Sequence, residues 1–354
     1  MLQWRVLHWL VGAVALVLPS AAVSQVQVNQ NFVSQGPAPA FGPIGVSRSA
    51  DAPPNGNVTG AIGPVIADPL NANRFFIGTV GGGIWSTTNG GVTWTPLTDK
   101  QATLSISSLA FDPTDPNRNT LIAGTGLTAN GTVCLRGPCF FTGSGGLRNG
   151  LLYSNDGGST WTSLGAAALG GQTVDAVAAR GNVLLAGTFE ESLLVPASQR
   201  RVGGLYRSAD GGATFTLISG TGGLPTGPVN SIVGDPNNSN RIYAAVSSPG
   251  AATNAQTALF VSNNAGANWT QVFGAAQSSG TISAANQTTL KIASAPGGAL
   301  AVGVVNLATR TVTGLFWSGN SGASWTALAV PALNNGNQAP INFAITIDPP
   351  IRGP

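Results

Sequence analysis

The chain contains very little that can ionise. Charged residues make up 8% of its 354 residues, and it has a single histidine, His8, and a single methionine, Met1. His8 lies in an N-terminal segment that we expect to be removed, so the mature chain offers no histidine for a Ser-His-Asp triad or a metal site. Removing Arg5 as well leaves 14 of the 15 basic residues against 12 acidic ones. This near-neutral balance has no basic stripe, so we expect no nucleic-acid partner.

The N-terminal segment has the form of a secretory signal peptide. Arg5 gives it a positive start, residues 10–18 form a short apolar core, and Ala22-Val23-Ser24 is a small-residue cleavage site. We therefore predict a signal peptide over residues 1–24 and a secreted or periplasmic protein. The alternative is a retained membrane anchor, but the apolar run falls short of the roughly twenty residues that a span needs. No later segment is apolar enough to span a membrane.

Cysteine is also scarce. The two cysteines, Cys134 and Cys139, lie close together in the stretch CLRGPC. In an exported protein such a pair is expected to form a disulfide that closes a loop. A redox role is the alternative, but the spacing is not C-x-x-C and no helix follows.

Small and turn-forming residues are abundant, with 49 glycines and 23 prolines. This composition favours many short strands joined by tight turns. Within it, one eight-residue pattern occurs five times: TTNGGVTW from Thr87, SNDGGSTW from Ser154, SADGGATF from Ser208, SNNAGANW from Ser262 and SGNSGASW from Ser318. A period of about fifty residues indicates a repeat architecture, and a catalytic site would not be copied five times along one chain.

Each octet lies between two short strands. Apolar stretches such as GLLYS and ALFVS precede it, and stretches such as TWTSL and NWTQV follow it. The octet is therefore predicted to be the turn of a β-hairpin, because glycine accepts positive φ and Ser, Asp and Asn side chains bond nearby amides. The aromatic residue at its end is expected to pack back across the hairpin.

A second element precedes the octet in most units. Stretches such as VIADPLNANRFFIGT and IVGDPNNSNRIYAAV combine an apolar strand, an Asp-Pro turn and a second strand. Each unit then holds four strands, and four antiparallel strands repeated radially form a propeller blade. We predict an all-β protein, a β-propeller of about five four-stranded antiparallel blades whose ring may be left incomplete.

The repeats also suggest the domain boundaries. Residues 1–24 are the signal peptide, residues 25–45 a Pro-rich lead-in that could supply a closing strand, and residues 46–340 the five blades. The stretch FAITIDP in residues 341–354 matches the first strand of a sixth blade, and the expected second strand does not follow it. The sequence therefore also fits a truncated fragment of a larger surface protein.

These octets resemble the Asp-box, or BNR, repeats of sialidase-like β-propellers. The preceding Asp-Pro pattern is similar to that of sortilin-type receptors, family 74 xyloglucan hydrolases and photosystem II assembly factors. The resemblance covers roughly residues 60–348 and implies the fold, but the superfamily mixes enzymes, receptors and assembly factors. Three of the five octets carry Asn where the others have Asp, which preserves the turn bonds without the charge. We assign a structural role to these octet residues: Thr87, Asn89, Trp94, Ser154, Asp156, Trp161, Ser208, Asp210, Phe215, Ser262, Asn264, Trp269, Ser318, Asn320 and Trp325.

Strand parity places any binding site at the opposite end of the blades. The Asp-Pro and octet turns share one end, so the longer and more varied connections collect at the other, where binding is usually built. Tolerated surface insertion is the alternative reading of these loops. Ser107, Asp175 and Asn230 take equivalent positions at the start of three inner strands, next to the expected central channel. The binding candidates are Ser107, Asn230, Arg136, Phe140, Phe141, Arg148, Arg200, Arg201 and Arg310.

Catalysis has fewer candidates. A sialidase would need an arginine cluster and a Tyr-Glu pair, but Tyr153 and Tyr206 lie directly before octets, and the chain's two glutamates are adjacent. A two-carboxylate glycosidase needs two acids on the loop side of the blades. The pair that fits best is Asp175 with Glu190 or Glu191.

The sequence thus favours a secreted, non-catalytic propeller that binds a protein or a glycan through its variable loops. The alternatives are a glycoside hydrolase of the sialidase-like superfamily and a fragment of a larger surface protein. No cofactor or metal is expected.

Overall fold

A computed structural model describes residues 40–41, 57–58, 62–126, 148–191, 203–247, 257–283, 288–331, 339 and 343–347, and for residues 190–191 the backbone alone. The chain divides into two units, Met1–Thr59 and Gly60–Pro354. In the first unit, β1 (Ala40–Phe41) pairs antiparallel with β2 (Asn57–Val58). The domain boundaries drawn from the sequence remain predictions.

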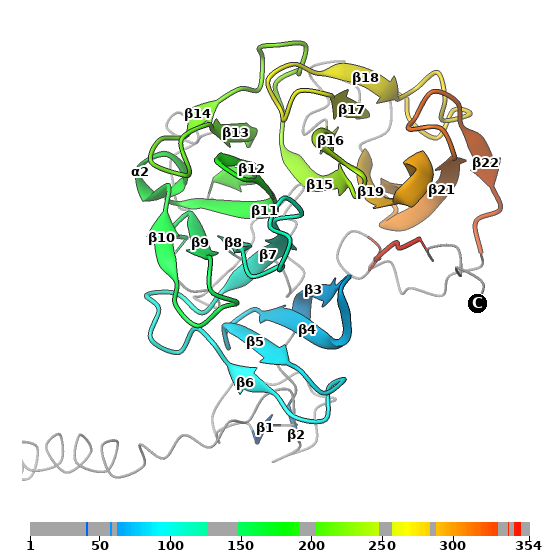
Figure 1. Ribbon diagram of the computed structural model, residues 1–354. Coiled ribbons are helices and arrows are strands. Elements are labelled where there is room, and N and C mark those ends of the chain that lie inside the picture. Colours follow the sequence, from blue (N-terminus) through cyan, green and yellow to red (C-terminus); the bar gives the residue numbers. More distant parts are fainter. Residues whose placement is uncertain are drawn as a thin grey trace, which may run out of the picture. The chain divides into compact units, whose positions relative to one another are not determined.

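The described part of the second unit consists of five four-stranded antiparallel sheets, which confirms the predicted all-β propeller (Figure 1). In each sheet the strands follow one another in chain order, as in a meander. Blades one and two are β3 (Ile62–Asp68), β4 (Asn71–Thr79), β5 (Ile84–Thr87), β6 (Thr95–Pro96), then β7 (Ile106–Phe111), β8 (Leu121–Thr125), β9 (Leu151–Ser154), β10 (Thr162–Leu164). Blades three to five are β11 (Gln172–Arg180), β12 (Val183–Glu191), β13 (Leu205–Ser208), β14 (Thr216–Leu217); β15 (Val229–Asp235), β16 (Asn238–Val246), β17 (Ala258–Ser262), β18 (Thr270–Phe273); β19 (Thr288–Ala295), β20 (Ala299–Asn306), β21 (Thr311–Ser318), β22 (Thr326–Leu328).

The first strand of each blade is its innermost strand. Contacts run from β3 to β7, from β7 to β11, from β11 to β15 and from β15 to β19, so these five strands follow one another around the axis (Figure 1). A glycine in the second strand lets the next blade approach. A methyl group on Gly124 would lie 2.3 Å from the Val174 carbonyl oxygen, and one on Gly187 would lie 2.4 Å from that of Val229. Only glycine avoids these backbone clashes, so the spacing between blades depends on it.

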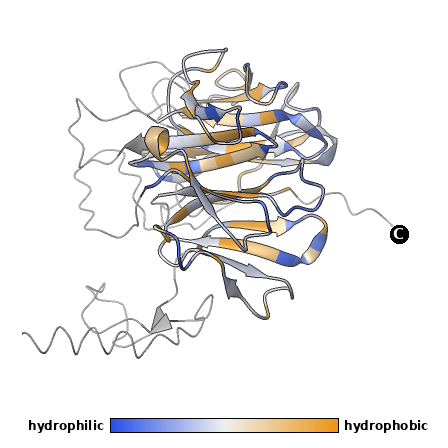
Figure 2. Cartoon of the chain, turned by 60° about the vertical axis from the view of Figure 1, so that its left-hand side comes forward, coloured by the Kyte–Doolittle hydropathy of each residue, from blue (hydrophilic) through white to orange (hydrophobic). Residues whose placement is uncertain are grey.

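The apolar core lies between the blades. One cluster joins the buried residues Tyr243, Leu259, Leu290 and Phe316 of blades four and five. Figure 2 shows apolar residues concentrated along the strands and hydrophilic ones in the turns. Because an inner blade has a neighbour on each face, the second strands β8, β12 and β20 consist mostly of apolar and small residues.

Each octet forms the hairpin turn that the sequence predicts. In the second blade the Ser154 hydroxyl donates to Asp156 Oδ1 (2.8 Å) and accepts from the Gly158 amide (2.9 Å). The Thr160 amide donates to Asp156 Oδ1 (2.9 Å), and Trp161 Nε1 donates to the Gly158 carbonyl (2.9 Å). The turn therefore satisfies its own polar groups, and its Trp closes over it.

The octet turn is also bonded to the first turn of its own blade. An amide at the fourth octet position donates to a carbonyl at the start of the second strand in every blade: Gly90 to Asn73, Gly157 to Asn119, Gly211 to Asn182, Ala265 to Asn240 and Ser321 to Gly298. Both kinds of turn therefore lie at one end of the blades, which we call the turn end. The opposite end, where the inner strands begin, is the loop end.

Helix is almost absent from the described residues: there are α2 (Ala166–Leu169), a 3₁₀ turn over Pro296–Gly298 and the single helical residue Ala339. In the part of the chain that the structure describes, no helix has the length and apolar character to cross a membrane.

The stretch predicted as the first strand of a sixth blade is described only over residues 343–347, and no strand is formed there. Its Phe343 ring packs against blade five, where a methyl group on Gly303 would lie 2.4 Å from Phe343 Cε1. At Gly124 and Gly187, the inner strand of the next blade packs equally closely against the glycine.

Candidate functional site

Polar residues mark the loop end of three successive inner strands. The strand pairing shifts register between Ile106 and Ser108, between Val174 and Ala176, and between Val229 and Ser231. The extra residue in each bulge is Ser107, Asp175 or Asn230, the three residues whose equivalence the sequence predicts. A β-bulge re-aims a side chain and is common beside functional sites.

Two of these bulge residues bond to the next blade. The hydroxyls of Ser107 and Ser108 both donate to the Val174 carbonyl (2.7 Å each). The Asn230 amide nitrogen donates to the hydroxyl of Thr289 on β19, and Ser247 Oγ donates to Asn230 Oδ1 (3.1 Å). Ser107 is buried, so its hydroxyl serves the joint between blades two and three.

Asp175 differs from the other two bulge residues. It is partly accessible, as expected beside the axis, yet enough protein surrounds it that burial raises the pKa of its carboxyl to about 7. The positive charges of Lys291 and Arg148 act in the opposite direction. At neutral pH this carboxyl is therefore close to half protonated, a state suited to donating or accepting a proton.

Lys291 is a site residue that our reading of the sequence missed. It lies on β19, the inner strand of blade five, and burial lowers the pKa of its ammonium group while Asp175 acts to raise it. A single charge inside the apolar run TTLKIAS was the available signal, since an inner strand seldom carries a lysine without a partner. Asp175 lies on blade three, 116 positions earlier in the chain than Lys291, so the repeat period does not reveal their interaction.

Arg148, which belongs to blade two, forms hydrogen bonds with the backbone at the loop end of β11. Its Nη1 donates to the Gly171 carbonyl (3.3 Å), and the Gly171 amide donates to the Arg148 carbonyl (2.9 Å). We use the name axial cluster for the charged residues Asp175, Lys291 and Arg148. Each of them comes from a different blade.

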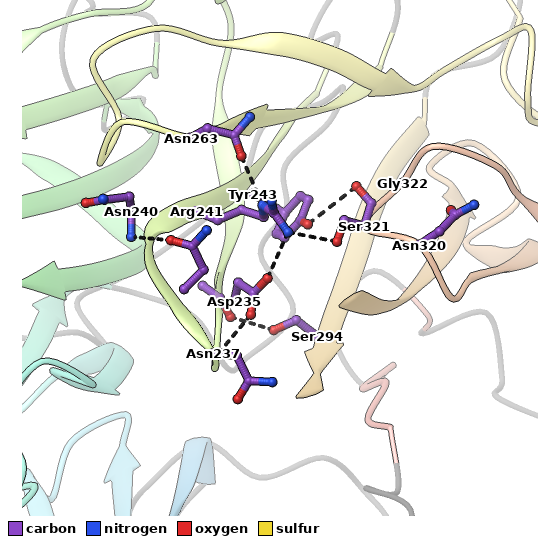
Figure 3. A network of polar contacts seen from close by, with 12 residues as sticks. Asp235, Asn237, Asn240, Arg241, Tyr243, Asn263, Ser294, Asn320, Ser321 and Gly322 are labelled. Atoms are coloured by element: carbon purple, nitrogen blue, oxygen red, sulfur yellow. Dashed lines mark hydrogen bonds and ion pairs between the residues drawn. The ribbon is translucent and has the colours of Figure 1, made fainter. Parts of the chain in front are cut away.

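The turn end carries a different kind of network (Figure 3). Arg241 Nη1 forms an ion pair with Asp235 (3.2 Å) and donates to Ser321 Oγ (2.9 Å) in the octet of blade five. Arg241 Nε donates to Asn263 Oδ1 (2.9 Å). The arginine of an Asp-Pro turn therefore ties its own blade to the next one.

A similar clasp joins blades one and two. Arg74 Nη1 pairs with Asp68 (3.1 Å), and its Nη2 donates to Asn119 (3.5 Å). Between blades three and four the link comes from a different position: Arg207 on β13 donates through its Nε to the Ala265 carbonyl (3.0 Å) in the octet of blade four. The carboxylates and guanidinium groups named here therefore form ion pairs or hydrogen bonds within the fold.

The other predicted site residues are only partly covered by the structure. Arg310 lies exposed in the turn between β20 and β21, at the loop end, with φ of 58°. The backbone of Glu191 pairs with Gln172, which puts it at the same end as Asp175. The following residues lie outside the described ones: Cys134, Cys139, Arg136, Phe140, Phe141, Arg200 and Arg201.

Among the residues that the structure describes, no cluster of three or more His, Cys, Asp and Glu side chains could hold a metal ion. At the loop end the described part offers the carboxyl of Asp175, the cationic groups of Lys291, Arg148 and Arg310, and several short hydroxyl and amide side chains. The exposed Asp99 and Lys100 lie in the connection between β6 and β7 at the same end.

The fold and its octet turns together define the class: the chain has the fold of the BNR-type β-propellers. No family model and no curated protein matches the sequence. Among solved structures, an ancestral GH74 enzyme is similar at 19% identity and a TM-score of 0.50, covering 76% of this chain and 31% of that one. The GH74 xyloglucanase from Xanthomonas campestris is similar at 20% identity and a TM-score of 0.49, and the match covers 78% of this chain and 39% of the xyloglucanase.

YCF48 bound to D1 peptide is similar at 15% identity and a TM-score of 0.43, covering 76% of this chain and 69% of that one. At such identities the likeness concerns the fold alone. The chain spans less than two fifths of the length of the two GH74 enzymes.

Proposed function

We propose that the protein is a secreted or periplasmic propeller that binds a protein or a glycan partner at its loop end, without catalysis. The observation that carries this proposal is the contrast between the ends. At the turn end the described carboxylates of the Asp-Pro and octet turns bond within the fold, whereas the loop end presents the axial cluster. Variable connections on a rigid scaffold, next to a partly accessible charged group, are a common basis for binding.

A glycoside hydrolase is the second candidate, and Asp175 is the observation that favours it. A carboxyl with a pKa of about 7 is suited to general acid catalysis. Hydrolysis also needs a second carboxyl on the other side of the scissile bond. Asp175 with Glu190 or Glu191 remains the pair to test for that role.

One experiment separates the two. The mature chain is screened on a glycan array and against candidate partner proteins, and bound glycans are assayed for new reducing ends. Binding without release of reducing ends, reduced by substitutions at the loop end and unchanged by the turn-end substitution Asp156→Asn, is the expected result. Reducing ends that disappear in Asp175→Asn would contradict it and establish the hydrolase.

A further inference from the structure

One face of blade one is apolar and uncovered. Gly78 of β4 packs against Ile106 of blade two, so Ile77 beside it projects from the opposite face. Val65 of β3 pairs with Ile77, shares that face and is 62% exposed, and Ala67 two residues further on is exposed as well. By contrast, no residue of the inner strands β7, β11, β15 and β19 is exposed. Of the five described inner strands, β3 alone therefore presents an uncovered apolar face.

Blade five has a corresponding face on the side away from blade four. Phe316 of β21 packs in the core shared with blade four, so Leu315 and Trp317 beside it project from the opposite face. Leu328 of β22 pairs with Leu315 and is 48% exposed. Gly303 of β20 also pairs with Leu315 and lies on this face. We call this face of blade five, and the uncovered face of blade one, the two free faces.

Residues 343–347 lie against the free face of blade five, through the contact of Phe343 with Gly303 (Figure 1). Their side chains alternate in burial: Phe343, Ile345 and Ile347 are partly buried, whereas Ala344 and Thr346 are exposed. This is the period of a β-strand with one side on a sheet. Among the described residues, the only backbone hydrogen bond of the segment runs from the Phe343 amide to the Ala339 carbonyl (3.3 Å). The segment therefore presents the unpaired backbone of an open strand edge.

We propose that an extended segment of a partner protein adds as a β-strand to residues 343–347 and packs its side chains against the two free faces. Contacts join successive inner strands from β3 to β19, and among the described strands no comparable contact leads from β19 back to β3. In a complete blade the inner strand pairs with a second strand, and residues 343–347 occupy the place of an inner strand without one. This goes beyond the proposed function, because it adds a second partner site between blades.

The second strands of the complete blades define the chemistry of the partner segment. They lie in the equivalent place, between two blades, and LIAGT of β8 is buried at every position. A segment that alternates apolar and polar side chains would bury polar groups against one of the two free faces. We therefore expect an uncharged segment that is apolar or small on both sides, held by backbone hydrogen bonds along one edge.

The probe is a fluorescein-labelled peptide with the sequence of residues 119–126, which contains the second strand of blade two. It is titrated with the full mature chain and followed by fluorescence anisotropy. In the folded blade, the Gly126 amide donates to the Ser105 carbonyl before the inner strand (3.1 Å). The Thr125 amide donates to the Gly150 carbonyl before the third strand (3.0 Å). Successive amides alternate between the two edges, so each edge can be blocked separately.

Two N-methylated peptides make a matched pair. Methyl groups on the amides of Ile122 and Gly124 block the edge that faces an inner strand, and we expect binding to weaken at least about tenfold. Methyl groups on the amides of Leu121 and Ala123 block the edge that faces a third strand, and the affinity should be retained. Both peptides have the same composition and apolar character, so adsorption without strand pairing would not separate them.

Three protein variants locate the site. Val65→Asp puts a charge on the free face of blade one, and Ile345→Asp removes the apolar contact of residues 343–347 with blade five. Each should weaken the unmodified peptide at least about tenfold. Val92→Asp is the control, because Val92 is 81% exposed in the octet turn of the same blade, and it should bind the peptide as the wild type does.

No binding of the unmodified peptide, equal weakening by both pairs of methyl groups, or unchanged binding in Val65→Asp and Ile345→Asp would overturn the proposal. A chain that sediments as a dimer and dissociates as the peptide binds would also overturn it, because a second copy then fills the site. Failure of the proposed function is a separate result. A partner that binds at the loop end and is indifferent to Val65→Asp leaves that function standing, whatever the peptide does.

Discussion

The two ends of the propeller shift the pKa of an aspartate carboxyl in opposite directions. At the turn end, hydrogen bonds from Thr160 and Ser154 hold the pKa of the Asp156 carboxyl near 2, and those from Thr214 and Ser208 do the same for Asp210. At the loop end, burial raises the pKa of Asp175 to about 7. A carboxyl with a low pKa is part of how the fold is held together, whereas one with a raised pKa costs stability and is a candidate for function.

The largest expected effect is the pH dependence of stability at the loop end. The folded pKa of Asp175, about 7, is above its unfolded value of about 4. The folded state therefore binds more protons between these values, and the contribution of Asp175 to stability falls as pH rises from about 4 to about 7. Asp175→Asn should raise the free energy of unfolding at pH 8 by roughly 3–4 kcal/mol relative to its effect at pH 4, since each of the three pKa units corresponds to about 1.4 kcal/mol; denaturant titration measures it.

A matched control for that substitution is Asp99→Asn, which removes an exposed aspartate from the connection between β6 and β7. Its effect should be the same at both pH values. An Asp175→Asn effect that does not change with pH would show that the two ends do not differ in this respect.

The second effect concerns the clasp at the turn end. Arg241→Met removes the ion pair to the buried Asp235 and the bond to Ser321 across the blade joint (Figure 3). Loss of a partner from a buried pair costs about 3–5 kcal/mol, and the partial exposure of Arg241 reduces this to about 2 kcal/mol. Urea unfolding measures it, and loop-end ligand binding should be unchanged. Weaker ligand binding in the folded variant would contradict the separation of the two ends.

A third effect compares two serines. The Ser154 hydroxyl both donates to Asp156 and accepts from Gly158, so Ser154→Ala should destabilise the protein by about 1–2 kcal/mol. Ser107→Ala should cost less, because Ser108 donates to the same Val174 carbonyl. Thermal unfolding of the two variants ranks them, and a larger loss for Ser107→Ala would mean that the loop end carries more of the stability than we infer.

The smallest effect is the exchange of Asp for Asn in an octet. Asn89 already bonds as Asp156 does, with its Oδ1 accepting from the Thr93 amide (2.9 Å) and its Nδ2 donating to Thr93 Oγ1 (2.8 Å). Asp156→Asn should leave the unfolding midpoint at pH 7 unchanged. Because the folded pKa of Asp156 is depressed, its contribution to stability is lost as pH falls from about 4 to about 2, and the variant should lose less stability over that range. Equal acid sensitivity of variant and wild type would contradict this account.

The turn end was predictable from the sequence because its interactions are local. Ser154, Asp156, Gly158 and Trp161 bond to one another within eight residues, and the pattern is repeated five times. The four-strand unit follows from the same repetition. The equivalence of Ser107, Asp175 and Asn230 could also be read from their spacing to the following turn, although not the bulges that set them apart.

The axial cluster could not be predicted in the same way. Lys291 and Asp175 belong to different repeats, and their interaction depends on how three blades are arranged about the axis. The clasps of Arg74 and Arg241 likewise reach into the next blade. Periodicity shows that Arg74 and Arg241 occupy the same place in their repeats, but it does not show which residues of the next blade they contact.

The most direct test of the difference between the ends is a carbon-detected NMR titration of the aspartate side-chain carboxyls of the mature chain from pH 2 to 9. We expect Asp175 to titrate near pH 7 while Asp156 and Asp210 titrate near pH 2. An Asp175 midpoint near 4, the value for a solvated aspartate, would contradict the account, because the loop end would then hold no desolvated carboxyl.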